Sequence, residues 1–174
     1  MTQLVDRPPV ARRTPAPLPP DRLLDIVCGL ARDADTWRAL ARHDREQRWY
    51  VRLTANHRYD AWLIGWYGHQ GVDLHDHGGS AGALFVVEGE LLETAGRLGV
   101  EGGLRVQRLT VGAATAFGPG HVHGVVNPSP KIATSIHVYS PALTTMDFYE
   151  TESDSTFRRL RTELADPRPD QRHG

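Results

Sequence analysis

The sequence predicts a mainly β domain, a sandwich or small barrel of short strands with a small helical part at its N-terminus. From Gln47 onward, short segments of alternating or apolar residues follow one another along the chain. Turns rich in glycine and proline separate them, such as Gly78-Gly79 and Gly118-Pro119-Gly120. No helix-length pattern alternates with the strands, which argues against a parallel sheet built from βαβ units.

The predicted strands share an apolar, β-branched and aromatic composition or a strict alternation of apolar and polar residues. They cover residues 49–53, 61–67, 84–87, 104–111, 122–126 and 132–139. Residues 156–164 near the end of the chain are expected to form a short helix.

Two helices are expected before the first strand. Asp21 is expected to cap the first helix, and Leu23 and Val27 lie on its apolar face. The second covers residues 35–41, with Trp37 and Leu40 pointing inward. Both helices are expected to pack on the outside of the sheets.

The chain of 174 residues suits one domain with a sizeable core. Residues 1–20 are rich in proline and arginine and are expected to form a disordered arm. The single domain is placed at residues 21–165, and residues 166–174 are expected to be a disordered tail.

Composition argues against several classes of partner. The formal net charge of −1 leaves no basic footprint for nucleic acid, and no apolar run approaches membrane-spanning length. Cys28 is the only cysteine, so no intramolecular disulfide can form. We therefore expect a soluble cytoplasmic protein without nucleic-acid, membrane or obligate protein partners.

Two pairs of histidines suggest a metal site. His75 and His77 are one residue apart in an extended segment, and so are His121 and His123. The members of each pair point to the same side, because strand side chains alternate between faces. Neutral imidazole nitrogens are good ligands for iron or zinc. His121 has three interpretations: a third ligand, a residue beside the ligands, or a polar strand residue.

These segments resemble the two sequence motifs of the cupin superfamily. The second follows the pattern Gly120-x-x-His123-x-x-x-Asn127, which favours His123 over His121 as a ligand. The first motif normally contains a glutamate ligand shortly after its second histidine, where this chain has Ala81 and Gly82. The resemblance therefore implies a cupin β-barrel of the jelly-roll type. Its metal ligands would be His75, His77 and His123.

Two further groups of polar residues share a strand face. Ser135, His137 and Tyr139 alternate along one strand, and unpaired buried polar groups cost about 1–3 kcal/mol each. These side chains would either form hydrogen bonds with one another beside a cavity or face water on an edge strand. Tyr50 and Arg52 also share a face; arginine suits a carboxylate, although a strand arginine is usually solvated.

Taken together in this order, the motifs resemble the cysteine dioxygenase type I family over residues 48–148. The resemblance implies a mononuclear ferrous ion held by the three histidines. It also implies that Arg52, helped by Tyr50, binds the substrate carboxylate. Tyr139 would point at the metal, positioned by His137, which Ser135 supports. A cis peptide would join Ser140 to Pro141.

The implied activity is an iron-dependent thiol dioxygenase that converts L-cysteine and dioxygen to cysteine sulfinate. Related 3-mercaptopropionate dioxygenases usually carry glutamine in place of Arg52, which favours cysteine here. The alternatives are a dioxygenase for 3-mercaptopropionate or another small thiol, and a non-catalytic metal-binding cupin sensor. Animal members cross-link a cysteine to the tyrosine at the metal site. This chain has Gly82 at that position, so we expect no Cys–Tyr thioether.

Overall fold

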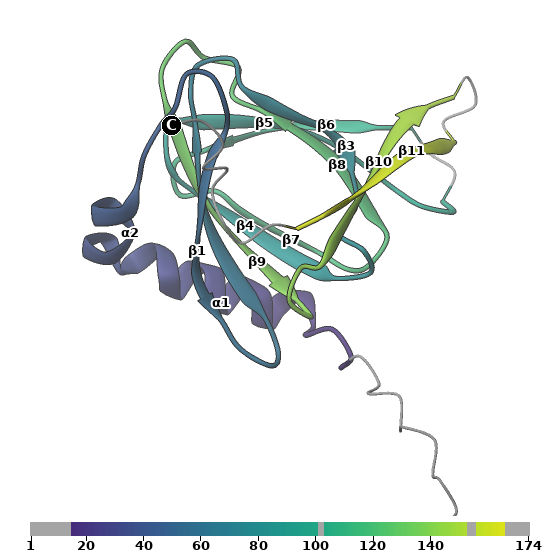
Figure 1. The fold of residues 1–174 in the computed structure, drawn as a ribbon, viewed down its shortest axis with the longest axis horizontal. Coiled ribbons are helices and arrows are strands. Elements are labelled where there is room, and N and C mark those ends of the chain that lie inside the picture. Colours follow the sequence, from purple (N-terminus) through teal and green to yellow (C-terminus); the bar gives the residue numbers. More distant parts are fainter. Residues whose placement is uncertain (1–14, 101–102, 153–155, 166–174) are drawn as a thin grey trace, which may run out of the picture.

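The computed structural model describes residues 15–100, 103–152 and 156–165, and it confirms a mainly β fold with a small N-terminal helical part (Figure 1). The helices are α1 (Pro20–Arg32) and α2 (Ala34–Leu40). The strands are β1 (Trp49–Ala55), β2 (Asp60–Trp66), β3 (Gly71–His75), β4 (Ala81–Glu88), β5 (Glu90–Arg97), β6 (Arg105–Thr110), β7 (Ala114–Phe117), β8 (His121–Val126), β9 (Ala133–Ser140), β10 (Thr145–Thr151) and β11 (Phe157–Leu164).

The strands form two antiparallel sheets that face each other around a common interior (Figure 1). One sheet has five strands in the order β1-β2-β9-β4-β7, and the other has six in the order β11-β10-β3-β8-β5-β6. Strands that are neighbours in space are therefore mostly distant in sequence, as in a jelly roll. Every residue of β9, which lies between β2 and β4, is buried.

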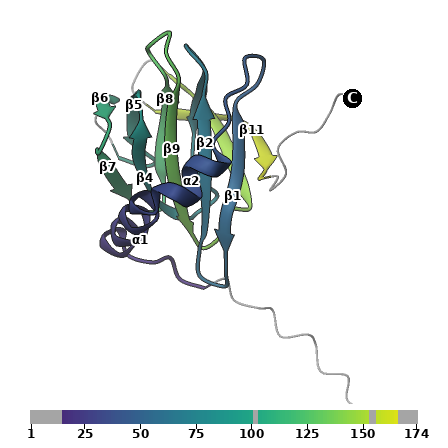
Figure 2. The ribbon, with the colours of Figure 1, turned by 90° about the vertical axis from the view of Figure 1, so that its left-hand side faces the viewer.

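Both helices pack on the outside of the five-stranded sheet, as predicted (Figure 2). Leu23 and Val27 of α1 have no exposed area, and burying such side chains stabilises the fold by about 1.5–3 kcal/mol each. The predicted cap is wrong. Pro19 is the N-cap, Pro20 begins the helix, and Asp21 lies within the first turn. Proline is favoured at the first helical position because its missing N–H would have no partner there.

Trp37 of α2 is buried, as predicted, whereas Leu40 is 41% exposed. The prediction for Leu40 is wrong because α2 is only seven residues long and ends at this residue. Asp33 caps α2, since its carboxylate accepts hydrogen bonds from the backbone N–H and the hydroxyl of Thr36.

Each predicted strand has a counterpart in the structure, but the short helix predicted at residues 156–164 is wrong. Residues Phe157–Leu164 form strand β11, which pairs antiparallel with β10 along its whole length. The ring of Phe157 packs edge-on against that of Tyr149, with centroids 6.1 Å apart. The free edge of β10 therefore determines the conformation here, rather than the local helix propensity.

The first residues described, 15–19, lie within the predicted disordered arm. Leu18 is buried there, and its N–H donates to Ser140 Oγ at 2.9 Å. The rest of that arm, residues 1–14, and the predicted tail, residues 166–174, lie outside the described residues. Among the residues described, no helix combines the length and apolar character needed to cross a membrane.

Candidate metal centre

Three histidines converge at one end of β3. His75 is the last residue of β3, and it pairs with His123 of β8 in the ladder. His77 follows two residues after the strand ends. One ring nitrogen from each lies within 4.8 Å of the others, and the ring centroids are 4.8–5.0 Å apart. All three side chains are buried.

A tight turn places His77 beside the other two rings. Asp76 accepts a hydrogen bond from the N–H of Gly78 at 3.0 Å and another from the hydroxyl of Tyr149 at 2.9 Å. Gly78 and Gly79 have φ values of 58° and 88°, which side chains rarely allow. The chain therefore reverses immediately after His77.

The three rings each leave a nitrogen free to bind a metal. Nδ1 of His75 donates to the carbonyl of Asp73 at 2.8 Å, and Nδ1 of His123 donates to Glu93 Oε1 at 2.6 Å, which leaves Nε2 of each ring unprotonated. Both ring nitrogens of His77 are buried and have no hydrogen-bond partner among the described residues. Burial, followed by the neighbouring imidazoles, lowers the pKa of His75 and His77 well below the usual value.

Burial likewise lowers the pKa of His123, so the whole set is neutral near pH 7. Neutral imidazole is the form that coordinates a metal. A divalent ion would also give one of the two buried nitrogens of His77 a partner, so this donor set fits a mononuclear metal site.

Glu93 of β5 holds His123 in place, and sequence reasoning missed it. Its side chain is 1% exposed, and it accepts from His123, from Gln107 and, at 3.4 Å, from Nε2 of His121. Burial alone would raise the pKa of Glu93, but the hydrogen bonds from the two histidines outweigh it and hold the pKa well below its usual range. The carboxylate is therefore charged.

His121 lies beside the ligand set rather than within the three-histidine group. Its ring stacks on Phe117 with a centroid distance of 4.3 Å and an interplanar angle of 13°. The structure thus places His121 next to the carboxylate that orients His123.

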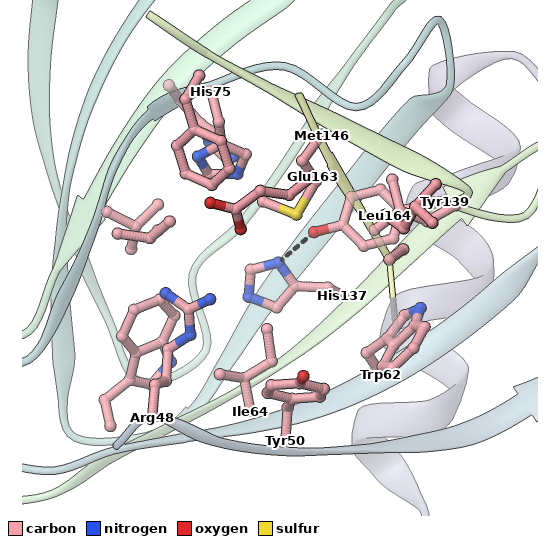
Figure 3. A pocket seen from close by; sticks show the side chains of 17 residues that line it. Arg48, Tyr50, Trp62, Ile64, His75, His137, Tyr139, Met146, Glu163 and Leu164 are labelled. Atoms are coloured by element: carbon pink, nitrogen blue, oxygen red, sulfur yellow. Dashed lines mark hydrogen bonds between the residues drawn. The ribbon is translucent and has the colours of Figure 1, made fainter. Parts of the chain in front are cut away.

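Ser135, His137 and Tyr139 form a hydrogen-bonded chain on β9, and burial of that strand excludes the edge-strand alternative. Nε1 of Trp66 donates to Ser135 Oγ at 2.9 Å, and we assign the Ser135 hydroxyl proton to the hydrogen bond with Nε2 of His137, 2.8 Å away. In this assignment Nδ1 of His137 donates to the hydroxyl oxygen of Tyr139, and the two atoms are 3.1 Å apart (Figure 3).

The pKa shifts keep both His137 and Tyr139 in their neutral forms. Burial lowers the pKa of His137 to about 3, so the ring is neutral. Burial, followed by the charge of Asp60, raises the pKa of Tyr139, so the phenol keeps its proton. Since the Tyr139 oxygen already accepts from His137, its own proton is free to point into the cavity.

A cavity of about 150 Å³ joins the metal centre to Tyr139 (Figure 3). Tyr50 lines it, and its part in substrate binding stays a prediction. Arg52 is exposed and is not among the lining residues, and its guanidinium carbon lies 5.8 Å from the ring centroid of Trp62. The lining residues are Arg48, Tyr50, Trp62, Ile64, Trp66, Val72, His75, His123, Val125, His137, Tyr139, Leu143, Met146, Phe148, Glu163, Leu164 and Ala165.

The sequence pattern of the cysteine dioxygenase type I family matches residues 20–152. The chain belongs to this family. The match includes the three histidines and the Ser135–Tyr139 segment, and the peptide between Ser140 and Pro141 is cis, as the resemblance implies. Membership in the cysteine dioxygenase type I family supports a dioxygenase-like function at a mononuclear metal site.

Solved structures agree on the fold. The protein TT1209 from Thermus thermophilus is 26% identical, with a TM-score of 0.53 over 60% of this chain and 93% of that one. An uncharacterized conserved protein with a double-stranded β-helix domain from Klebsiella pneumoniae is 16% identical, with a TM-score of 0.51 over 72% of this chain and 94% of that one. The domain is therefore a cupin-type double-stranded β-helix with a short helical part.

The absence of a Cys–Tyr thioether stays a prediction, and it concerns the neighbours of Tyr139. Gly82 pairs with Tyr139 in the ladder, and a Cβ at residue 82 would lie 3.1 Å from the Tyr139 ring and 2.5 Å from Phe117. Cys28 belongs to α1, which packs on the outer face of the sheet. Intact-mass measurement after aerobic turnover should therefore show no loss of two hydrogens. A peptide joining Tyr139 to Cys28 would contradict this prediction.

Proposed function

We propose that this protein is a ferrous-iron-dependent thiol dioxygenase that oxidises L-cysteine to cysteine sulfinate in the cytoplasm. The observation that carries the proposal is the convergence of three neutral, buried histidines, two of which, His75 and His123, line a small cavity together with the Tyr139 phenol. A cavity of about 150 Å³ suits a small thiol rather than a peptide or nucleotide.

Each part of the site has a role in this proposal. His75, His77 and His123 hold the ion, which when bound supplies the redox chemistry that transfers both atoms of dioxygen to the thiol sulfur. Tyr139 offers a hydrogen bond from its phenolic proton, and the chain from Ser135 through His137 fixes the direction of that proton.

The apolar part of the cavity wall has two functions in the proposal. Trp62, Trp66 and Phe148 exclude water from the reacting thiol, and their rings leave only a small volume for the substrate side chain. Exclusion of water also strengthens the hydrogen bond that Tyr139 offers.

The proposal is tested by oxygen uptake and sulfinate formation with iron-loaded protein. Cysteine, 3-mercaptopropionate and cysteamine are compared, with metal-free and zinc-loaded protein as controls. We expect one dioxygen consumed per sulfinate formed, only with iron, and fastest with cysteine. A higher rate with 3-mercaptopropionate would identify that thiol as the substrate. Binding of thiols without oxygen uptake would favour a non-catalytic sensor.

Glu163 supports the choice of cysteine, because its carboxylate points into the cavity from β11 (Figure 3). A negative charge there favours a thiol that also carries an amine over one that is purely anionic. Glu163→Gln should therefore lower the ratio of kcat/KM for cysteine to kcat/KM for 3-mercaptopropionate. The Glu163 side chain is 53% exposed, so we expect a change of about two- to fivefold, in line with exposed charge pairs. An unchanged ratio would remove Glu163 from substrate selection.

A further inference from the structure

We propose that the protein has a second ligand site, separate from the cavity at the metal centre, which binds a small molecule carrying two acid groups. The site is a second cavity of about 570 Å³, and two arginines, Arg97 and Arg105, line it. The proposal goes beyond thiol oxidation, because the cavity and its arginines are present whatever reaction the metal centre catalyses.

The second cavity lies where the two sheets end. β6 is the last strand of the six-stranded sheet and β7 is the last strand of the five-stranded sheet, and Figure 2 shows both at the same end of the barrel. Residues from both strands line the cavity, so it opens between these two edges. No described residue lines both this cavity and the one at the metal centre. Its charged and polar lining residues are Glu93, Arg97, Arg105, Gln107, Thr115 and His121.

Antiparallel pairing places the basic side chains on one face of the sheet. Arg105 of β6 pairs with Ala95 of β5, and His121 of β8 pairs with Arg97 of β5. Directly paired residues point to the same face, and so do residues two apart along a strand. Arg97, Arg105 and His121 therefore share the face that also carries Glu93. Arg97 and Arg105 are diagonal neighbours across β5 and β6, a spacing of about 7–8 Å.

The two arginines differ from the other arginine of β6 in having no acidic partner. Arg108 donates to Glu90 at 2.6 Å, whereas neither Arg97 nor Arg105 forms an ion pair with a described residue. A guanidinium group binds a carboxylate or a similar acid group through two parallel hydrogen bonds. Two such groups at diagonal positions therefore suit one small molecule with an acid group at each end.

Glu93, at the inner end of the cavity, does not occupy these arginines. Its side chain is 1% exposed, and its oxygens accept from His123, His121 and Gln107. The same contacts connect the second cavity to the metal centre, because Glu93 orients His123. A ligand held by Arg97 would lie beside His121, its partner in the ladder, and thus next to the residues that support the metal ligand.

Two sources could supply a molecule of this chemistry. The product of the proposed reaction, cysteine sulfinate, carries a carboxylate and a sulfinate separated by two carbon atoms. A free dicarboxylate such as succinate has the same spacing. Only the choice of cysteine sulfinate as a probe rests on the proposed function, and the shared requirement is two separated acid groups.

The test is titration calorimetry on the full-length, ferrous-loaded protein without oxygen, with succinate, cysteine sulfinate and acetate as probes. We expect saturable binding of succinate or cysteine sulfinate, and binding of acetate weaker by about tenfold or more, because acetate can engage only one arginine. Arg97→Ala and Arg105→Ala should each weaken binding of the two-acid probe by about 5- to 20-fold, and the double variant should abolish it. Tighter binding of cysteine sulfinate would identify the product as the ligand, and tighter binding of succinate a free dicarboxylate.

Arg108→Ala is the matched control, because it removes the same charge from the same strand outside the cavity. Its affinity for the two-acid probe should stay within about twofold of the wild type. The bound probe should also raise the melting temperature of the wild type and of Arg108→Ala, but not that of the double variant.

Three results would overturn the proposal: no saturable binding of either two-acid probe, wild-type affinity in the double variant, or an equal loss in Arg108→Ala. The proposed function can fail separately. If the wild type consumes no oxygen with any thiol, yet binds succinate in a manner that depends on Arg97 and Arg105, the second site stands and the dioxygenase proposal falls.

Discussion

Replacement of His77 by alanine should remove nearly all bound iron, whereas His121→Ala should keep about one ion per chain. Among the three candidate ligands, His77 is the one whose ring nitrogens have no hydrogen-bond partner among the described residues. The substitution to alanine therefore removes metal coordination without breaking a side-chain hydrogen bond. Loss of a residue that merely supports a ligand weakens metal binding by about 10–100-fold, and loss of a ligand itself should exceed that range.

The His121→Ala control distinguishes between two possible sets of metal ligands. Glu93, His121 and His123 also place ligand atoms within 4.8 Å of one another. If the ion bound there, His121→Ala would lose it and His77→Ala would not. We expect the reverse, because Glu93 already accepts the Nδ1 proton of His123 at 2.6 Å. Metal content after desalting and anaerobic titration with ferrous ion measure both variants. Oxygen uptake should follow metal content.

The metal site could be predicted from local spacing, although alternation along a strand accounts for only part of it. Alternation along a strand explains why His123 and His121 share a face. His77, however, lies beyond the end of β3, and the turn at Gly78 and Gly79 returns it to the site. The spacing of polar residues in β9 likewise predicted the shared face of Ser135, His137 and Tyr139, because every residue of a regular strand obeys the same alternation.

Glu93, and Arg48 as a residue of the cavity wall, could not be identified in this way, because their positions beside the site depend on residues distant in sequence. Arg48 directly precedes β1 and has the same parity along the chain as Arg52 within it, and only the position of the cavity distinguishes the two. Glu93 lies in β5, whose sequence ELLETAGR has little β-branched character, so no strand was predicted there. Its partners His121, His123 and Gln107 come from β8 and β6. The segment RRLRTEL of β11 suggests a helix locally, and pairing with β10 overrides that tendency.

Replacement of Glu93 by glutamine should weaken ferrous-ion binding by about tenfold, and Glu93→Ala by up to about 100-fold. A carboxylate that accepts the Nδ1 proton of a ligand histidine fixes the ring and makes the opposite nitrogen more basic. Glutamine can still accept that proton through its carbonyl oxygen, so the orientation of His123 survives, but the charge is lost. Alanine removes both effects and leaves the buried Nδ1 donor of His123 without this acceptor.

Glu90→Gln is the matched control, since Glu90 lies in the same strand and its carboxylate binds Arg108 near the surface, with 31% of the side chain exposed. Its ferrous-ion affinity should equal that of the wild type. Thermal melting of the metal-free proteins distinguishes loss of affinity from loss of the fold. Glu93→Gln should melt within a few degrees of the wild type and yet require more ferrous ion to reach half occupancy. If both variants bind iron with wild-type affinity, Glu93 stabilises the barrel alone, and the orientation of His123 depends on its packing against Phe117 and His75.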